Sequence, residues 1–237
     1  MRIGINALFL IPGKVGGSEI YLRNLLGNLT MIDRENEYIL FTNMENSGTF
    51  KISQDNFREV LCPIRASFRP IRILWEQFIL PFQIKKYRIE VLHSPGYTAP
   101  LLASCCSIVT IHDMNYFYYP EDFSKLTTFF LKLLVPLAAR RSDKIITVSR
   151  NSKKDIVQIL KIPVSKICVI YEAGSSHLSV PIVIENKVRE KLKERCGIDK
   201  KFMLTVSVSH PHKNLHRLIE AYGILCKRYQ IACQLLI

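Results

Sequence analysis

The segment 2-RIGINALFLIPGKVGGSEIYLRNLLGNL-29 combines an apolar run, a glycine-containing loop and an amphipathic pattern. Residues 2–10 are mostly apolar, which is typical of a strand in a parallel sheet that is covered on both faces. Residues 18–29 place leucines at three- and four-residue intervals, so that one face of a helix is apolar. The segment therefore predicts a strand, a tight loop and a helix in succession.

The same succession continues through the first 180 residues. Further apolar runs predict strands at residues 37–43, 89–94, 107–113, 144–149 and 167–171. Helical patterns lie between most of them, at about residues 74–86, 123–140 and 150–160. Parallel strands need crossover connections, and such helices supply them. We therefore expect residues 1–180 to form a doubly wound, Rossmann-like α/β domain.

The chain after Val180 restarts this pattern. Residues 181–201 begin with a proline and are rich in charge, and we interpret them as a linker. A strand at 202–209 and a helix at 214–229 follow, with another strand at the end. About forty residues are too few to bury a core of their own. Residues 202–237 are therefore predicted to be the start of a second Rossmann-like domain, which is incomplete in this chain.

The composition excludes several protein classes. Hydrophobic residues make up 48% and charged residues 22% of the 237 residues, as in ordinary globular proteins. The best candidate for a membrane span, residues 126–141, is interrupted by Lys132 and Pro136 and is too short. Seven scattered cysteines without a C-x-x-C pair argue against a zinc site, and no signal-peptide pattern begins the chain. We therefore expect reduced thiols and a cytoplasmic location.

The net charge of +13 suggests an anionic partner. The sequence has no recognisable basic DNA-binding helix and no aromatic RNA-binding pattern, so nucleic acid is not an expected partner. Residues 68–89 interleave aromatic and basic side chains, a mixture that suits the surface of an anionic membrane. The alternative is a helix that packs into the core and has a solvated basic face.

Gly16 and Gly17 lie where the first predicted strand meets its helix. Open α/β sheets bind ligands beyond the carboxyl ends of their strands, and glycines would let a ligand approach the backbone amides there. Glu19 follows in the first helical turn, where the helix dipole favours negative charge. The loop matches neither the G-x-x-x-x-G-K-[ST] nor the G-x-G-x-x-G phosphate pattern. A turn without a ligand is the alternative.

Polar residues also end three of the later strands. His112 and Asp113 are adjacent, and a carboxylate beside an imidazole can orient the ring and raise its pKa. His93 ends an earlier strand but precedes a Pro-Gly turn, so we rank it second. Ser149 lies between a strand and a helix, where it either caps the helix or lines the site.

Lys213 opens the predicted helix of the second domain. Together with the helix N-terminus, its ammonium group could hold phosphate oxygens. His210, His212 and His216 surround it, but Pro211 separates the first two, and no Cys or carboxylate is adjacent. No metal site is therefore predicted.

Five motifs occur in an order that resembles one enzyme family. They are the Gly-Gly-x-Glu-x-Tyr loop at residues 16–21, 110-TIHD-113, 145-IITVSRNSKKDI-156, 167-ICVIYEAG-174 and 213-KNLHRLIEAY-222. Together they span nearly the whole chain, which resembles the retaining glycosyltransferases of family 4, with the GT-B fold. The resemblance implies an N-terminal domain that binds the acceptor and a C-terminal domain that binds a nucleotide-sugar donor, with no cofactor and no bound metal.

The resemblance also implies roles for single residues. Gly16 and Gly17 would lie near the donor diphosphate or the acceptor, and His112 would line the cleft near the transferred sugar. Lys213 would neutralise the diphosphate leaving group. The family usually has Arg where this chain has His212, which would weaken this part of the site. The remaining candidates are expected to line the cleft or contact the acceptor: Glu19, Asp113, His93 and Ser149.

The length of the chain departs from the family pattern. Paired glutamates that contact the donor lie later in the family's C-terminal domain, and this chain ends at Ile237, before them. The predicted function is a hexosyltransferase, with mannose as one candidate sugar, that acts on a glycan or lipid-linked acceptor in surface polysaccharide synthesis. The alternative is a truncated, non-catalytic remnant that binds the acceptor or a membrane. Peripheral contact with the inner face of the cell membrane is expected for either.

Overall fold

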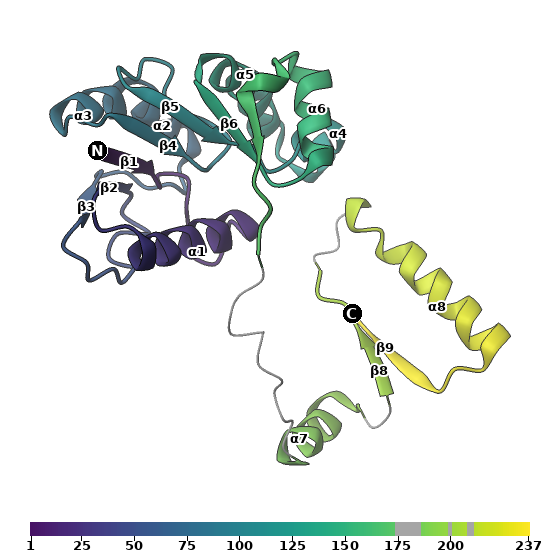
Figure 1. Ribbon diagram of the computed structural model, residues 1–237. Coiled ribbons are helices and arrows are strands. Elements are labelled where there is room, and N and C mark those ends of the chain that lie inside the picture. Colours follow the sequence, from purple (N-terminus) through teal and green to yellow (C-terminus); the bar gives the residue numbers. More distant parts are fainter. Residues whose placement is uncertain (174–185, 199–200, 208–210) are drawn as a thin grey trace. The chain divides into compact units, whose positions relative to one another are not determined.

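The computed structural model describes residues 1–173, 186–198, 201–207 and 211–237. The chain divides into two compact units, Met1–Ala173 and Gly174–Ile237 (Figure 1). The sequence predicts that the first domain ends at Val180 and that a linker follows at 181–201. Val180 and part of this linker lie outside the described residues, namely 181–185 and 199–200.

The first unit is built on one sheet of seven parallel strands. In spatial order they are β3 (Phe57–Leu61), β2 (Glu37–Thr42), β1 (Arg2–Asn6), β4 (Val91–Ser94), β5 (Cys106–Thr110), β6 (Lys144–Thr147) and β7 (Ile167–Val169). This arrangement confirms the doubly wound, Rossmann-like fold. The apolar pattern of the sequence did not predict β3, because Arg58 and Glu59 interrupt the pattern there. The strand tolerates them because it lies at the edge of the sheet and is partly exposed.

Strand β1 ends at Asn6, earlier than the sequence predicts. The apolar residues that follow are buried in a turn rather than in the sheet. Asn43 Nδ2 donates to the carbonyls of Leu8 (3.0 Å) and Leu10 (2.8 Å), and Asn46 Nδ2 donates to the carbonyl of Ala7 (2.7 Å). These buried amides satisfy carbonyls that a neighbouring strand would otherwise have to satisfy.

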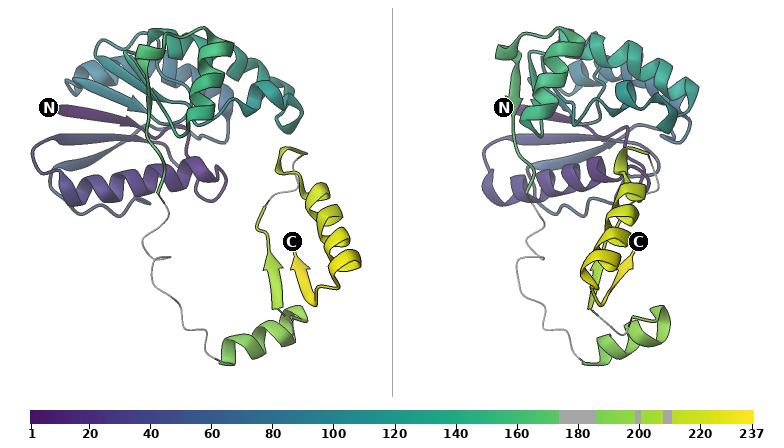
Figure 2. Two further views of the ribbon diagram at one scale, coloured as in Figure 1. Left: turned by 45° about the vertical axis from the view of Figure 1, so that its right-hand side comes forward. Right: turned by 90° about the vertical axis from the view of Figure 1, so that its right-hand side faces the viewer.

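Helices cover both faces of the sheet (Figures 1 and 2). On one face lies α1 (Gly17–Ile32), and on the other lie α2 (Arg69–Leu74), the π-helical turn η1 (Trp75–Ile79), α3 (Leu80–Lys86), α5 (Lys125–Arg141) and α6 (Arg150–Leu160). Right-handed crossovers explain this division, since connections running toward β3 and toward β7 must lie on opposite faces. Shorter turns complete the unit: α4 (Asn115–Tyr118), η2 (Pro120–Asp122) and η3 (Val164–Lys166).

Apolar side chains fill the space between the helices and the sheet. Leu22 and Leu26 of α1 pack with Ile5 on one face, and Ile84 of α3 packs with Phe41 on the other. Helices α5 and α6 form a third cluster with β5 and β6. Each such side chain contributes about 1.5–3 kcal/mol when fully buried. This packing fixes the N-terminal end of α1 at the carboxyl edge of the sheet.

The order of the strands reverses between β1 and β4. The chain leaves β1 toward β2 on one side, and it leaves β4 toward β5 on the other. Loops diverge at such a reversal and leave a crevice at the carboxyl ends of the strands. The crevice is therefore expected between the loop that follows β1 and the loops that follow β4 and β5.

The described part of the second unit is a β-α-β unit preceded by a helix. Its elements are α7 (Asn186–Cys196), β8 (Lys201–Leu204), the 3₁₀ turn η5 (Pro211–Lys213), α8 (Leu215–Tyr229) and β9 (Cys233–Leu236). Strands β8 and β9 are parallel, as the sequence predicts for the start of a second Rossmann-like domain. The last two residues of the predicted strand 202–209 lie outside the described residues. No helix in the described ranges is both long and apolar enough to cross a membrane.

Candidate active site

His112 lies at the crevice, just beyond the end of β5. Because side chains alternate along an extended chain, Thr110 and His112 point to the face of the sheet that α1 covers. The buried His112 ring packs edge-on against Tyr21 of α1, with 4.9 Å between the ring centroids. Tyr97, from the loop after β4, lies on another side of the ring at 5.5 Å. Two tyrosines from separate elements therefore fix the plane of the imidazole.

The two ring nitrogens of His112 have different neighbours. Nε2 lies 3.2 Å from the carbonyl oxygen of Pro95, which can only accept, so this contact places a proton on Nε2. Nδ1 lies 3.4 Å from Oε1 of Glu172, whose side chain is about half exposed. This pair becomes an ion pair only when the ring is protonated. Nδ1 is therefore the nitrogen at which a ligand can replace an exposed partner.

His93 lies beneath this site, in β4. Its Nε2 is 2.8 Å from the hydroxyl of Thr110, which in turn lies 3.5 Å from the hydroxyl of Tyr21. Burial, followed by repulsion from His112, lowers the pKa of His93 to about 4. Burial is also the main reason that the pKa of Tyr21 is raised. His93 is therefore neutral near pH 7 and joins the sheet to α1 through Thr110.

Asp113 does not pair with the neighbouring imidazole. Its Oδ1 accepts from the hydroxyl of Tyr97 (3.1 Å) and from the backbone N–H of Asn115 (3.0 Å), and its Oδ2 accepts from Asn115 Nδ2 (2.9 Å). The expectation that Asp113 orients His112 is wrong, because successive side chains of an extended segment point in opposite directions. Glu172, far along the sequence, is the carboxylate next to the ring.

Two glycines in the loop before α1 are exposed to solvent. Gly16 has φ +59° and precedes the helix without a capping side chain, and an added Cβ at Gly16 or Gly17 would meet nothing within 4 Å. Both carboxylate oxygens of Glu19 already accept hydrogen bonds, one from the backbone N–H of Gly13 (2.7 Å) and one from Arg23 Nε (2.9 Å). Glu19 therefore holds the loop in shape, while the amides of Gly16 and Gly17 stay accessible.

The last two candidates belong to other elements. Ser149 caps α6, because its hydroxyl accepts from the backbone N–H of Ser152 at 3.0 Å. Lys213 ends η5 in the second unit, with an exposed side chain, directly before Asn214 and α8. His210 lies outside the described residues. Among the residues that the structure describes, no three His, Cys, Asp or Glu side chains form a cluster that could hold a metal ion.

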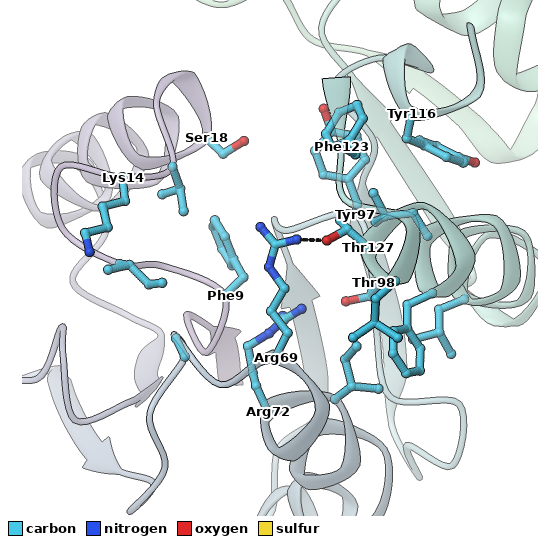
Figure 3. A pocket seen from close by; sticks show the side chains of 18 of the residues that line it. Phe9, Lys14, Ser18, Arg69, Arg72, Tyr97, Thr98, Tyr116, Phe123 and Thr127 are labelled. Atoms are coloured by element: carbon cyan, nitrogen blue, oxygen red, sulfur yellow. Dashed lines mark hydrogen bonds between the residues drawn. The ribbon is translucent and has the colours of Figure 1, made fainter. Parts of the chain in front are cut away.

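A cavity of about 280 Å³ adjoins the His112 site (Figure 3). Tyr97 and Asp113 belong to both, since they line the cavity and lie at the carboxyl ends of β4 and β5. Phe9 lies on one side of the opening, and Figure 3 shows Arg69 between Phe9 and Thr127, with Arg72 closer to the helix below. The carboxyl edge of the sheet therefore carries a fixed imidazole, bare backbone amides and a basic cavity.

A protein-family model matches most of the first unit. The model of Glycosyltransferase Family 4 matches residues 15–173, which include α1, both histidine-bearing strand ends and the whole carboxyl edge beyond β4. The chain belongs to glycosyltransferase family 4. The resemblance to family 4 inferred from the motifs is thereby confirmed.

Relatives of known identity agree with this family. The O-antigen chain mannosyltransferase RfbU of Salmonella typhimurium is 28% identical over 135 residues, which are 57% of this chain and 33% of RfbU. Anabaena HepE in complex with UDP and glucose superposes with a TM-score of 0.61 at 19% identity, over 99% of this chain and 60% of HepE. A glycosyltransferase from Rickettsia africae gives a TM-score of 0.55 at 18% identity, over 99% and 59% of the two chains. These structures show the same fold, and this chain spans about 60% of their length.

Sequence reasoning missed several residues around His112. Glu172 stands in the quoted motif 167-ICVIYEAG-174, but nothing in the motif shows that it returns to the end of β5. Gly174 of the same motif lies outside the described residues. For Tyr97 and Thr110, the sequence showed only that they lie near strand ends, which does not predict contact with His112. Alternation along β5 could have found Thr110, because it lies two positions before His112.

Proposed function

We propose that this chain carries the acceptor-side domain, and the start of the donor-side domain, of a retaining hexosyltransferase. The enzyme would move a hexose from a nucleotide-sugar to a glycan or lipid-linked acceptor in surface polysaccharide synthesis. Membership of family 4 supplies the reaction class. The observation that carries the assignment to this site is the imidazole of His112, which is held between two tyrosines in the crevice.

The proposed chemistry follows from the charges that develop during transfer. Departure of the nucleotide builds negative charge on the diphosphate, and amide donors and a lysine stabilise such charge. The bare amides of Gly16 and Gly17, at the positive end of α1, and the ammonium group of Lys213 are proposed for this role. No metal ion or cofactor is required for it.

His112 is proposed to shape the sugar subsite. Its Nε2 is occupied by the Pro95 carbonyl, so Nδ1 is the ring atom that can face a sugar hydroxyl. The exposed Glu172 beside Nδ1 can be displaced by such a hydroxyl without opening the core. His93, Glu19 and Ser149 are then supporting residues, and Asp113 lines the acceptor side through its bond to Tyr97.

Mannose is the proposed sugar because the relative from S. typhimurium is a mannosyltransferase. The solved structures of HepE contain UDP or UDP-glucose, which supports a nucleotide-sugar donor. The stereochemistry can be tested by proton NMR of the newly formed linkage. Retention predicts that the product has the anomeric configuration of the donor sugar. A product of opposite configuration would show that the enzyme inverts.

A second candidate function is favoured by the completeness of the first unit. Residues 1–173 contain the whole seven-stranded sheet and the His112 site, while the described second unit has one parallel strand pair. A non-catalytic protein that binds an acceptor needs only the first unit. Calorimetry separates the two functions: the non-catalytic protein binds an acceptor but no nucleotide-sugar, whereas tight binding of a nucleotide-sugar supports the transferase.

The proposed location is the cytoplasm, with peripheral contact to the inner face of the cell membrane. Exposed apolar side chains form two stripes, which we call the α2–α3 stripe (Phe68, Ile71, Leu74, Phe78 and Phe82) and the α5 stripe (Leu126, Phe129 and Leu133). Basic side chains flank both, including Lys85, Lys86 and Lys132. Aromatic and basic side chains together favour an anionic membrane surface.

Co-sedimentation with vesicles tests this location. We expect binding to vesicles that contain phosphatidylglycerol and little binding to vesicles of phosphatidylcholine alone. Phe82 is 71% exposed, so Phe82→Glu should abolish binding without affecting the fold. Met31 is 75% exposed on α1, on the opposite face of the sheet, and Met31→Glu is the matched control. Equal binding by the Phe82 and Met31 variants would contradict membrane contact through the α2–α3 stripe.

A further inference from the structure

The cavity beside the active site has one basic wall and one apolar wall (Figure 3). Arg69 and Arg72 of α2 supply the basic wall, and Lys14 lines the cavity from the loop before α1. Among the described residues that line the cavity, Asp113 is the only acid. The apolar wall comes mainly from α5 and its neighbours: Phe123, Leu126, Phe130, Leu131 and Leu134. Phe9 lines the cavity from the loop after β1, on the other side of Arg69 (Figure 3).

Arg72 is the most buried cation of this wall. Its side chain is 13% exposed, and its Nη1 is buried and donates to none of the described residues. The nearest acid is Glu76, whose Oε2 lies 3.6 Å from Nη1, too far for a hydrogen bond. A buried charged donor without an acceptor is costly. Nη1 therefore lacks an acceptor among the described residues, and Arg72 also lines the cavity, where a ligand could supply one.

Arg69 adds a second guanidinium on the same helix. It reaches across the opening and donates to the hydroxyl of Thr127 on α5. Burial, together with repulsion from Arg69, lowers the pKa of Arg72, while Glu76 opposes that shift. An anion between the two guanidiniums would relieve their repulsion. The carboxylate of Asp113 already accepts three hydrogen bonds from Tyr97 and Asn115, so it offers little competition for the arginines.

The apolar wall continues to the protein surface. Leu126 lines the cavity and is also 53% exposed. Phe129 and Leu133 extend it along α5, while the α2–α3 stripe begins next to Arg69. A ligand with a charged head in the cavity could therefore place a hydrocarbon chain along these exposed side chains.

We infer that the cavity binds the phosphate or diphosphate head of an amphiphilic acceptor, whose hydrocarbon chain lies on the α5 stripe. Arg72 and Arg69 hold the phosphate oxygens, a geometry for which guanidinium groups are suited. A volume near 280 Å³ is just below the range of ligand pockets, which is about 300–1,000 Å³, so the cavity accommodates a head group rather than a whole glycolipid.

This inference deepens the proposed function and rests on it for the role of the ligand as an acceptor. Tyr97 connects the cavity to the reacting end of the site, because it lines the cavity and contacts the His112 ring. A sugar attached to a phosphate in the cavity would therefore start next to His112. Binding of the phosphate, however, can be measured without any transfer.

Calorimetry with three probes tests the site on the full 237-residue chain. The probes are decyl phosphate below its micellar concentration, inorganic phosphate, and decyl maltoside as a neutral amphiphile. We expect decyl phosphate to bind more tightly than either of the others. Arg72→Gln should weaken its binding about 10- to 100-fold, because a charge-assisted hydrogen bond is lost. Arg34→Gln, which changes an exposed base in the loop between α1 and β2, should leave the affinity unchanged.

Substitutions at two exposed residues keep the test valid if the Arg72→Gln variant does not fold. Arg69→Gln removes the second guanidinium, and Leu126→Asp places a negative charge at the opening; each should weaken binding of decyl phosphate. Equal affinities for decyl phosphate and decyl maltoside, or for decyl phosphate and inorganic phosphate, would overturn the inference, as would native affinity in both variants. Tight binding of decyl phosphate without sugar transfer would support the cavity site while refuting the proposed enzyme. Sugar transfer without tight binding of decyl phosphate would support the proposed enzyme and refute the cavity site.

Discussion

Replacing Gly96 with alanine tests how closely the loop after β1 packs on the loop after β4. An alanine Cβ would lie 2.5 Å from Cγ and Cδ1 of Phe9 and 3.0 Å from its Cβ. These atoms lie near the base of the Phe9 side chain, so rotation of the ring cannot relieve the clash. Gly96 does not have a positive φ, so alanine adds no backbone strain. The whole effect is therefore steric.

Overpacking of this kind costs about 1–3 kcal/mol. For a unit of roughly 170 residues, each kcal/mol lowers Tm by about 2–4 °C. We therefore expect Gly96→Ala to lower Tm by about 2–12 °C. Trp75, the single tryptophan of the chain, lies in the first unit, so its fluorescence reports the unfolding of that unit.

Gly27→Ala is the matched control for this substitution. Gly27 is exposed in α1, and an added Cβ meets nothing within 4 Å, so alanine should stabilise the helix by about 0.4–1 kcal/mol. In a Phe9→Ala background, Gly96→Ala should lose most of its cost, because Cγ and Cδ1, the two atoms at 2.5 Å, are gone. A native Tm for Gly96→Ala, or an unchanged cost in the Phe9→Ala background, would refute the packing argument.

Three further predictions concern the residues around the site. Below about pH 6.5 the unfolded chain protonates His93, whereas the folded chain does so only near pH 4, so stability should fall across this window by up to about 3 kcal/mol. Urea unfolding between pH 7 and pH 4.5 should show this loss, and His93→Gln should reduce it; an unchanged pH dependence would contradict a neutral, buried ring. Ser149→Ala should cost about 1 kcal/mol in the same assay by removing the cap of α6, and a cost near zero would show that the cap contributes nothing. Transfer activity should survive treatment with EDTA, because lysine and amide groups are proposed to neutralise the diphosphate, and its loss would show that a metal ion takes part.

The pattern of apolar residues predicted most of the fold. Continuous apolar runs found six strands of the first unit, because buried parallel strands are apolar on both faces. The same criterion failed for β3, where Arg58 and Glu59 lie in an edge strand. It also extended β1 through Leu10, because a buried turn held by Asn43 and Asn46 is as apolar as a strand.

The site was predictable only in part. His112 could be placed, because a strand end at the carboxyl edge is a property of local sequence. Its partner Glu172 could not, because the contact depends on how β7 leaves the sheet. The stretch 68–89 showed its aromatic and basic character, but nothing local shows that Arg72 turns inward to the cavity while Phe82 stays exposed. Tertiary packing decides which side of such a helix is buried.

The rate at which labelled mannose passes from its nucleotide donor to a glycan acceptor should be compared for the native chain, His112→Ala and His216→Ala. His216 is an exposed histidine of α8, so its substitution controls for the loss of an imidazole elsewhere. We predict transfer by the native chain and by His216→Ala, and a rate about 10²–10³-fold lower for His112→Ala. A native rate in His112→Ala, or no transfer by the folded native chain, would contradict the proposal that this chain transfers sugar at the His112 site.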